Sequence, residues 1–238
     1  MRLDKLLTVT ATATRSEAAR AVRAGTVLVN GTAARSAAMH VDPERARIEY
    51  AGHAVEYRAH HYLILNKPQG YVSATEDGRD PTVLDLLPQK YTALGLFPCG
   101  RLDKNTVGLM LLTDDGDLAH RLLSPRRHVE KRYFFRVKFP LNEQECARFE
   151  GGLVLDDGYE TKPAGIELGA DLCSGVITLV EGKYHQIKRM MQALHNQITH
   201  LERIRFGPLS LPADLARGEW RELTGEEEQA LLAAANIT

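Results

Sequence analysis

The sequence lacks the features of a membrane protein and of a disulfide-bonded secreted protein. No stretch of about 18 apolar residues occurs, so we expect no membrane-spanning helix and no membrane partner. Residues 1–5 lead directly into amphipathic sequence without the apolar region of a signal peptide, which predicts a cytoplasmic location. The three cysteines, Cys99, Cys146 and Cys173, lie far apart. They predict a reducing compartment and no disulfide framework.

Motifs for cofactors and metals are absent as well. The chain has no Gly-x-Gly-x-x-Gly motif, no P-loop and no His-Glu-x-x-His motif. Neither the cysteines nor the nine histidines have the spacing of metal ligands. We therefore expect no cofactor and no metal site.

The net charge of −1 hides two basic segments. Residues 1–40 hold six Lys or Arg against two acidic residues, and residues 121–138 hold seven, Arg126 among them, against one. Binding of phosphates requires local positive surface and not a positive total. The pattern favours a nucleic-acid partner, although solvated surface charge would also explain it.

The first 58 residues predict a small separate module. Leu3, Leu6 and Leu7 have helical spacing, and residues 14–17 form a capping box that opens a second helix ending near Gly25. Strands are expected at 26–29 and within 48–57, with tight turns at residues 30–31 and 51–52. The polar stretch 57–61 is expected to link this module, residues 1–58, to a second domain, residues 59–238.

The second domain predicts an α+β fold. Apolar strands are expected at 62–66, 107–113 and 133–139, and helices at 116–123, 142–150, 184–195 and 224–234. No regular alternation of strand and helix occurs, which favours a mixed, largely antiparallel sheet.

Residues 100–116 are the most informative segment for chemistry. A polar loop there carries Asp103 between Arg101 and Lys104 and leads into an apolar strand. Nearby cations favour an ionised carboxylate, which can act as a nucleophile or a base. A structural Asp paired with a neighbouring base is the alternative from local chemistry. Asp114 and Asp115 precede a predicted helix, so we interpret them as capping residues.

The predicted helix at 184–195 places Lys188 at the edge of its apolar face. Tyr184, Ile187, Met191 and Leu194 fall on one stripe, and Lys188 lies beside it. A lysine there can bury its stem and deliver its ammonium to a carboxylate, or simply extend to solvent. Lys183 and Arg189 are expected to point outward and to suit phosphate contacts.

Four segments together resemble the pseudouridine synthase family. They are the Lys-Pro-x-Gly run at 67–70, the Gly-Arg-Leu-Asp loop at 100–103 with its following strand, the Lys-Arg-Tyr run at 131–133, and residues 181–190. They occur in the family's order. Residues 2–5, 15–18 and 27–31 resemble the S4 RNA-binding domain, so the resemblance covers nearly the whole chain. An S4 domain followed by this catalytic domain is similar to the RsuA group of the family.

The resemblance implies an isomerase that converts a uridine in RNA to pseudouridine without a cofactor. It implies that Asp103 drives cleavage of the glycosidic bond, by attacking the ribose or by deprotonating it. It implies that Tyr133 stacks on the flipped base and that Lys188 pairs with Asp103, where the family often has Arg. A core aromatic is the alternative for Tyr133. We expect further RNA contacts from Arg101, Lys104, Lys131, Lys183, Ile187, Arg189, Arg2, Lys5, Arg15, Arg20 and Arg23.

The segments at 124–131 and 185–190 most resemble members of the RsuA group that modify the small subunit. The expected partner is therefore ribosomal RNA, at uridine 516 of 16S rRNA in a partly assembled small subunit, and the expected state is a monomer. Relatives that modify 23S rRNA and a non-catalytic ribosome-assembly protein are alternatives. A nuclease or a glycosidase is disfavoured, because each requires more than one working carboxylate.

Overall fold

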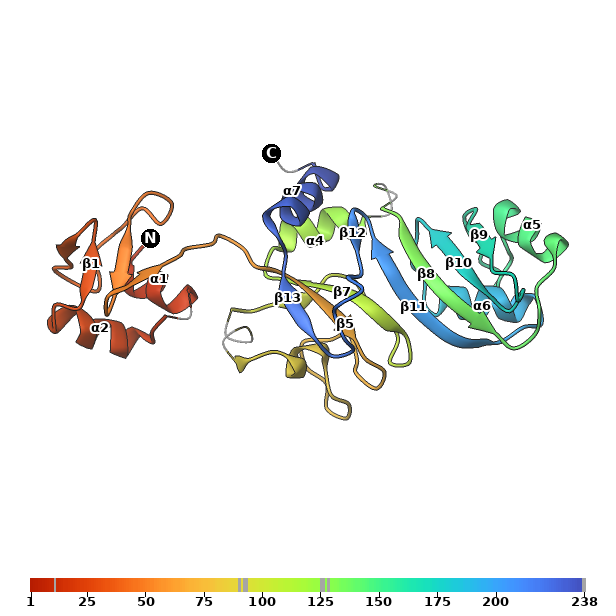
Figure 1. Ribbon diagram of the computed structural model, residues 1–238, viewed down its shortest axis with the longest axis horizontal. Coiled ribbons are helices and arrows are strands. Elements are labelled where there is room, and N and C mark those ends of the chain that lie inside the picture. The colour runs from red at the N-terminus through yellow and green to blue at the C-terminus, as the bar shows by residue number, and fades with distance from the viewer. Residues whose placement is uncertain (11, 90, 92–93, 125–126, 128, 237–238) are drawn as a thin grey trace. The chain divides into compact units, whose positions relative to one another are not determined.

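The computed structural model describes residues 1–10, 12–89, 91, 94–124, 127 and 129–236 (Figure 1). By its internal contacts the chain divides into two compact units. Unit 1 comprises residues 1–61 and 88–96, and unit 2 comprises residues 62–87 and 97–238. The predicted domain boundary after residue 58 stays a prediction. No helix within the described ranges is long and apolar enough to cross a membrane.

Unit 1 contains the helices α1 and α2 and a small sheet. The sheet has the strand order β2-β1-β3-β4. The elements are α1 (Leu3–Val9), α2 (Arg15–Arg23), β1 (Val27–Val29), β2 (Thr32–Ala33), β3 (Ile48–Tyr50) and β4 (His53–Val55). The predicted capping box at the start of α2 is present, with Thr14 Oγ1 accepting from Glu17 N and Glu17 Oε2 accepting from Thr14 N. Leu3, Leu6 and Leu7 are fully buried and form the core with α2 and β1.

Unit 2 is built on one mixed sheet. Its strand order is β13-β5-β7-β11-β8-β10-β9, with β12 paired to β11 and β6 paired to β7. The strands are β5 (Tyr62–Lys67), β6 (Phe97–Pro98), β7 (Val107–Thr113), β8 (Lys131–Val137), β9 (Gly165–Leu168), β10 (Ser174–Leu179), β11 (Ile198–Phe206), β12 (Leu209–Ser210) and β13 (Trp220–Glu222). The pairing of β7 with β11 is parallel, and the other strand pairs of this sheet among the described residues are antiparallel. The predicted α+β fold with a largely antiparallel sheet is confirmed.

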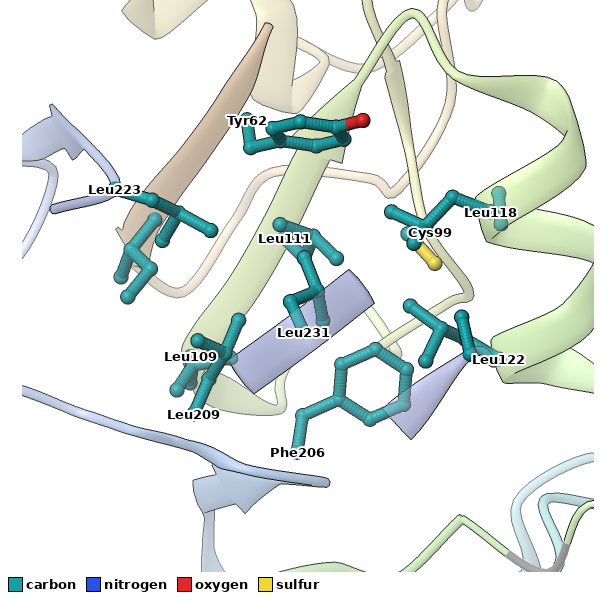
Figure 2. Close-up of a cluster of buried hydrophobic side chains, with 13 residues drawn as sticks. Tyr62, Cys99, Leu109, Leu111, Leu118, Leu122, Phe206, Leu209, Leu223 and Leu231 are labelled. Carbon is teal, nitrogen blue, oxygen red and sulfur yellow. The ribbon is translucent and has the colours of Figure 1, made fainter. Parts of the chain in front are cut away.

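The helices of unit 2 cover parts of this sheet. They are the 3₁₀ turn η1 (Val83–Leu86) and the α-helices α4 (Gly116–Leu123), α5 (Glu143–Gly151), α6 (Gln186–Ala193) and α7 (Gly225–Ala234). Helices α4 and α7 lie together over β7, and their leucines form the cluster shown in Figure 2 with Leu109 and Leu111 of that strand. Asp115 caps α4 by accepting from Leu118 N at 2.9 Å, as its sequence position predicts.

A glycine permits the two halves of the sheet to join. Gly108 on β7 lies opposite Arg203 on β11 in the parallel pair and has a φ of 99°. A Cβ at this position would lie 2.4 Å from the backbone oxygen of Arg203 and 2.9 Å from its nitrogen. Only glycine can therefore occupy the position without displacing the neighbouring backbone.

We predict that Gly108→Ala destabilises unit 2 by about 3 kcal/mol, because overpacking and a left-handed φ add together. Gly116→Ala is the matched control, since a Cβ at that helix start meets nothing within 4 Å. Urea unfolding monitored by Trp220 fluorescence measures the effect, because this single tryptophan lies in β13 of the same sheet. Equal unfolding midpoints for the two variants would contradict the proposed close approach.

Candidate active site

The carboxylate of Asp103 lies at the centre of the site, in the loop that leads into β7. Its Oδ2 accepts a hydrogen bond of 2.5 Å from Lys188 Nζ, on α6. Its Oδ1 lies 3.6 Å from Nε2 of His185. The expected pairing of Asp103 with Lys188 is thus present across 85 residues of sequence. The Asp103 side chain keeps 25% of its surface exposed, so a reactant can reach it.

A buried lysine holds the loop from behind. Lys67 has no exposed surface, and its Nζ donates to the backbone oxygens of Thr106 at 2.9 Å, Pro68 at 3.1 Å, Asp103 at 3.2 Å and Lys104 at 3.4 Å. Burial lowers the pKa of Lys67 to about 8, while the negative charge of Asp103 opposes that shift. The lysine of the Lys-Pro-x-Gly run therefore fixes the backbone of the loop that carries Asp103.

Three further hydrogen bonds, from two residues, hold the same loop at its start and middle. Ser73 Oγ donates to Leu102 O at 2.8 Å and accepts from Leu102 N at 3.0 Å. The backbone nitrogen of Gly70 donates to Lys104 O at 2.9 Å. The position of Asp103 is consequently set by backbone bonds on both sides of it, which limits its conformational freedom before any ligand binds.

A cavity of about 1010 Å³ opens beside Asp103. Its walls include the side chains of Tyr133, Leu179, Ile187 and Leu201, which are 3–8% exposed. Tyr133 lies on β8, opposite Ile177 of β10 in the sheet. The cavity combines apolar side chains with the ion-paired carboxylate of Asp103 and several cations, which suits a ligand with a ring and a polar, charged part.

Arg203 adds a buried charge that sequence reasoning missed. It is 1% exposed, lines the cavity, and its Nε donates to Leu109 O at 2.7 Å. Its guanidinium carbon lies 5.1 Å from the centroid of the Phe206 ring, a cation–π contact. The strand that carries it was not predicted. Its apolar residues, Ile198, Leu201, Ile204 and Phe206, do not alternate with the period of a strand, so the sequence carried no clear signal for it.

Lys131 is turned toward the protein interior. Its Nζ donates to Val129 O at 2.9 Å and lies 5.6 Å from the centroid of the Phe206 ring. Burial, together with the positive charge of Arg203, lowers the pKa of Lys131 to about 8. Lys131 lines the cavity, and its contact with RNA stays a prediction.

Other predicted cations have partners that the sequence did not reveal. Lys104 forms an ion pair of 2.6 Å with Asp80, so the cation paired with Asp103 is Lys188 and not its sequence neighbour Lys104 or Arg101. Arg101 is exposed and lines the cavity. The expected outward orientation of Arg189 is wrong.

Arg189 is held by two carboxylates on the loop before β9. Its guanidinium pairs with Asp156 and, at 2.6 Å, with Asp157, and its side chain is only 14% exposed. An RNA phosphate would have to compete with both of these carboxylates. Lys183 is exposed, as expected, with its Nζ 4.7 Å from the centroid of the Tyr159 ring.

The predicted apolar stripe needs a correction at its start. Helix α6 begins at Gln186, because His185 adopts a left-handed backbone conformation with a φ of 50°. Tyr184 therefore lies outside the helix and is 72% exposed. The buried residues of α6 are Gln186, Ile187, Met190 and Met191, and Leu194 is buried directly after the helix.

Glu181 fixes the turn that precedes α6, and sequence reasoning also missed it. This carboxylate is 8% exposed and accepts from Tyr159 Oη at 2.8 Å, Lys162 N at 3.0 Å and Gln186 Nε2 at 2.6 Å. Its position inside the last matching segment was the available signal. Because all three bonds are internal, we interpret Glu181 as structural.

The remaining predicted RNA contacts lie in unit 1. Lys5, Arg15, Arg20 and Arg23 are exposed. Arg2 donates to the Asp4 carboxylate through Nε at 3.0 Å and Nη2 at 2.6 Å. Arg126, of the second basic segment, lies outside the described residues. Within the described part of the chain, no group of three or more His, Cys, Asp or Glu side chains is arranged to hold a metal ion.

Comparisons with known proteins agree with the geometry. Residues 61–193 match the family described as RNA pseudouridylate synthase, and residues 1–45 match the S4 domain. An uncharacterised RNA pseudouridine synthase of Bacillus subtilis is 45% identical over 230 residues, which cover 95% of this chain and 96% of that protein. The ribosomal small subunit pseudouridine synthase A of Escherichia coli is 41% identical over 229 residues, which cover 95% and 98%.

A solved structure gives the same result. The crystal structure of a pseudouridylate synthase is 36% identical and superposes with a TM-score of 0.69, covering 97% of this chain and 99% of that one.

We predict that stability responds to the buried ammonium of Lys131 between about pH 8 and pH 10. Its folded pKa of about 8 lies below the unfolded value of about 10.4. Over that window the unfolded state binds more protons, so the free energy of unfolding contributed by this residue rises with pH. Urea unfolding of the wild type and of Lys131→Met should show the wild type gaining stability relative to the variant as pH rises. Parallel curves would contradict a buried, proton-losing lysine.

Proposed function

Because this chain belongs to the RNA pseudouridylate synthase family, we propose that it isomerises a uridine of ribosomal RNA to pseudouridine, with uridine 516 of 16S rRNA as the target. The observation that carries the proposal is the Asp103 carboxylate, held by Lys188 in a cavity whose lining includes Tyr133. The similarity to the small subunit enzymes supports the choice of 16S rRNA.

The reaction makes three demands on the site. The target base must leave the helical stack, since its glycosidic bond cannot be reached inside a helix. The bond between N1 and C1′ must break, and C5 must then bond to C1′ after the base has turned. Product and substrate are isomers, so atoms and electrons balance without a cofactor.

The residues of the cavity meet these demands in the proposed assignment. Asp103 acts on the ribose as a nucleophile or as a base, and both roles need a carboxylate with a fixed direction. Lys188 orients it through a charge-assisted hydrogen bond. Tyr133, on β8, stacks on the flipped base, and Ile187, on α6, packs against the same base.

Lys67 supports this arrangement as a positioning residue. It reaches none of the side-chain atoms of Asp103 in its hydrogen bonds and acts through the loop backbone. A site whose reactive group is held in this way loses little entropy on reaching the transition state.

The S4 module is proposed to bind the same RNA without taking part in chemistry. Its exposed arginines on α2 suit phosphate contacts, which position a protein on RNA and carry little sequence information. We propose further that the protein works as a monomer in the cytoplasm, on 16S rRNA within a partly assembled small subunit.

We predict that Asp103→Asn abolishes isomerisation, lowering the rate at least about 10³-fold, since loss of a central catalytic group in other enzymes costs about 10⁴–10⁶. The change is isosteric, so RNA binding and the fold should persist. Pseudouridine is mapped across all rRNA in a gene-deletion strain complemented with the wild type, Asp103→Asn or the exposed control Asp214→Asn.

The wild type and the Asp214→Asn control should restore the modification at position 516, and Asp103→Asn should not. A deletion strain that keeps every rRNA pseudouridine would refute the proposed function. Loss at another position of 16S rRNA, or in 23S rRNA, would refute the proposed target and retain the reaction.

We predict that changing Arg15, Arg20 and Arg23 together to Ala weakens binding to structured 16S rRNA and reduces its salt dependence. Each lost phosphate contact lowers the slope of log K against log salt concentration by about 0.7–0.9. Filter binding at several salt concentrations measures it. The control is Arg45→Ala with Arg47→Ala, exposed arginines of the same unit that already pair with Asp42 and Glu49. Equal slopes for the two variants would show that the α2 arginines form only a solvated face.

A further inference from the structure

Tyr184 is unusual among the exposed side chains of this protein. Five large apolar or aromatic side chains are exposed among the described residues: Leu123, Phe139, Val154, Leu172 and Tyr184. Tyr184 has the largest exposed fraction, 72%, and it lines the cavity that contains Asp103. An aromatic ring kept in water beside a binding cavity is a candidate contact for a ligand that extends beyond the cavity.

The ring of Tyr184 is held in place by its neighbour. It stacks on the imidazole of His185, with the ring centroids 3.8 Å apart and the planes inclined by 21°. His185 adopts a left-handed backbone conformation, which is uncommon for a residue with a side chain. Its Nε2 lies 3.6 Å from Asp103 Oδ1, so the stack is anchored at the candidate catalytic carboxylate.

Positive charge accompanies the exposed ring. Lys183 precedes it and is exposed, and Arg101 is exposed on the cavity lining. Aromatic rings interleaved with cations are the pattern by which proteins bind single-stranded nucleic acid, because bases stack on the rings while phosphates meet the cations.

We propose that Tyr184, supported by His185, is a stacking platform for a nucleobase that flanks the target uridine in the RNA. The inference rests on the proposed function and deepens it by adding a second base contact. The site for the target base is different, since Tyr133 is 8% exposed and belongs to the cavity wall. A ring that is 72% exposed lies at the rim, where the neighbouring nucleotide passes as the uridine enters. Sequence-specific RNA readers use such splayed, stacked bases.

The test compares Tyr184→Leu, Tyr184→Phe and a matched control, Phe139→Leu. Phe139 is an exposed aromatic residue with a lysine nearby, Lys138 Nζ lying 5.3 Å from its ring centroid, and it does not line the cavity. Exposed substitutions of this kind should leave the fold intact. The probe is a hairpin RNA with the 16S sequence around position 516, and 2-aminopurine replaces each nucleotide flanking the uridine in turn.

Wild type should quench the 2-aminopurine fluorescence at one flanking position. Tyr184→Leu should lose that quenching and bind the hairpin roughly 5- to 150-fold more weakly, which corresponds to about 1–3 kcal/mol. Its KM should rise while kcat stays near that of the wild type. Tyr184→Phe should keep both quenching and affinity, since a phenyl ring stacks as well, and Phe139→Leu should match the wild type.

Equal binding and equal quenching by the wild type and Tyr184→Leu would overturn the platform. The same weakening in Phe139→Leu would overturn it too, by showing a general effect of lost surface. Conversion of the hairpin by the wild type is measured in parallel and reports on the proposed function. Because binding and quenching are read without turnover, failure of the platform and failure of the proposed function give different results.

Discussion

The backbone of β11 passes so close to Gly108 that no other residue fits there, and this approach joins the two halves of the large sheet. The loop that carries Asp103 ends where β7 begins, while β11 brings Arg203 beside the same cavity. Strand β8, which pairs with β11, contributes Tyr133. The relative position of the carboxylate, the buried cation and the aromatic wall is therefore a consequence of one parallel strand pair inside a sheet that is otherwise antiparallel.

Buried positive charge is the second constraint on the site. Lys67 and Arg203 are buried and Lys131 is partly buried, so each brings charge toward the protein interior, where an ammonium or guanidinium without partners would be very costly. Their partners are mainly backbone oxygens, so each cation fixes main chain around it. Lys67 gains most from this arrangement, since three carbonyls of the Asp103 loop and the carbonyl of Pro68 converge on it. The resulting rigidity gives Asp103 a single direction toward the cavity.

Local features of the fold were predictable because short-range interactions decide them. The capping box that opens α2 and the Asp115 cap of α4 depend on residues three positions apart. Strands β5 and β7 are mostly apolar, with polar residues only at their C-terminal ends, and all of their residues are buried. Strands β9 to β13 were not predicted. They are short or mix polar with apolar residues, so only their neighbours in the sheet define them.

The sequence by itself determined the fold class, the family and the loop that presents Asp103, since these depend on local patterns and on motifs that occur together. The family resemblance also implied the pair of Asp103 with Lys188 across 85 positions. Tertiary structure alone turned Arg189 onto two carboxylates, paired Lys104 with Asp80, and began α6 after the left-handed His185. Long side chains reach several ångströms from their backbone, so their partners depend on which strands and helices pack together. Periodicity along the chain contains no information on that packing, and the exposed ring of Tyr184 became visible only in the folded protein.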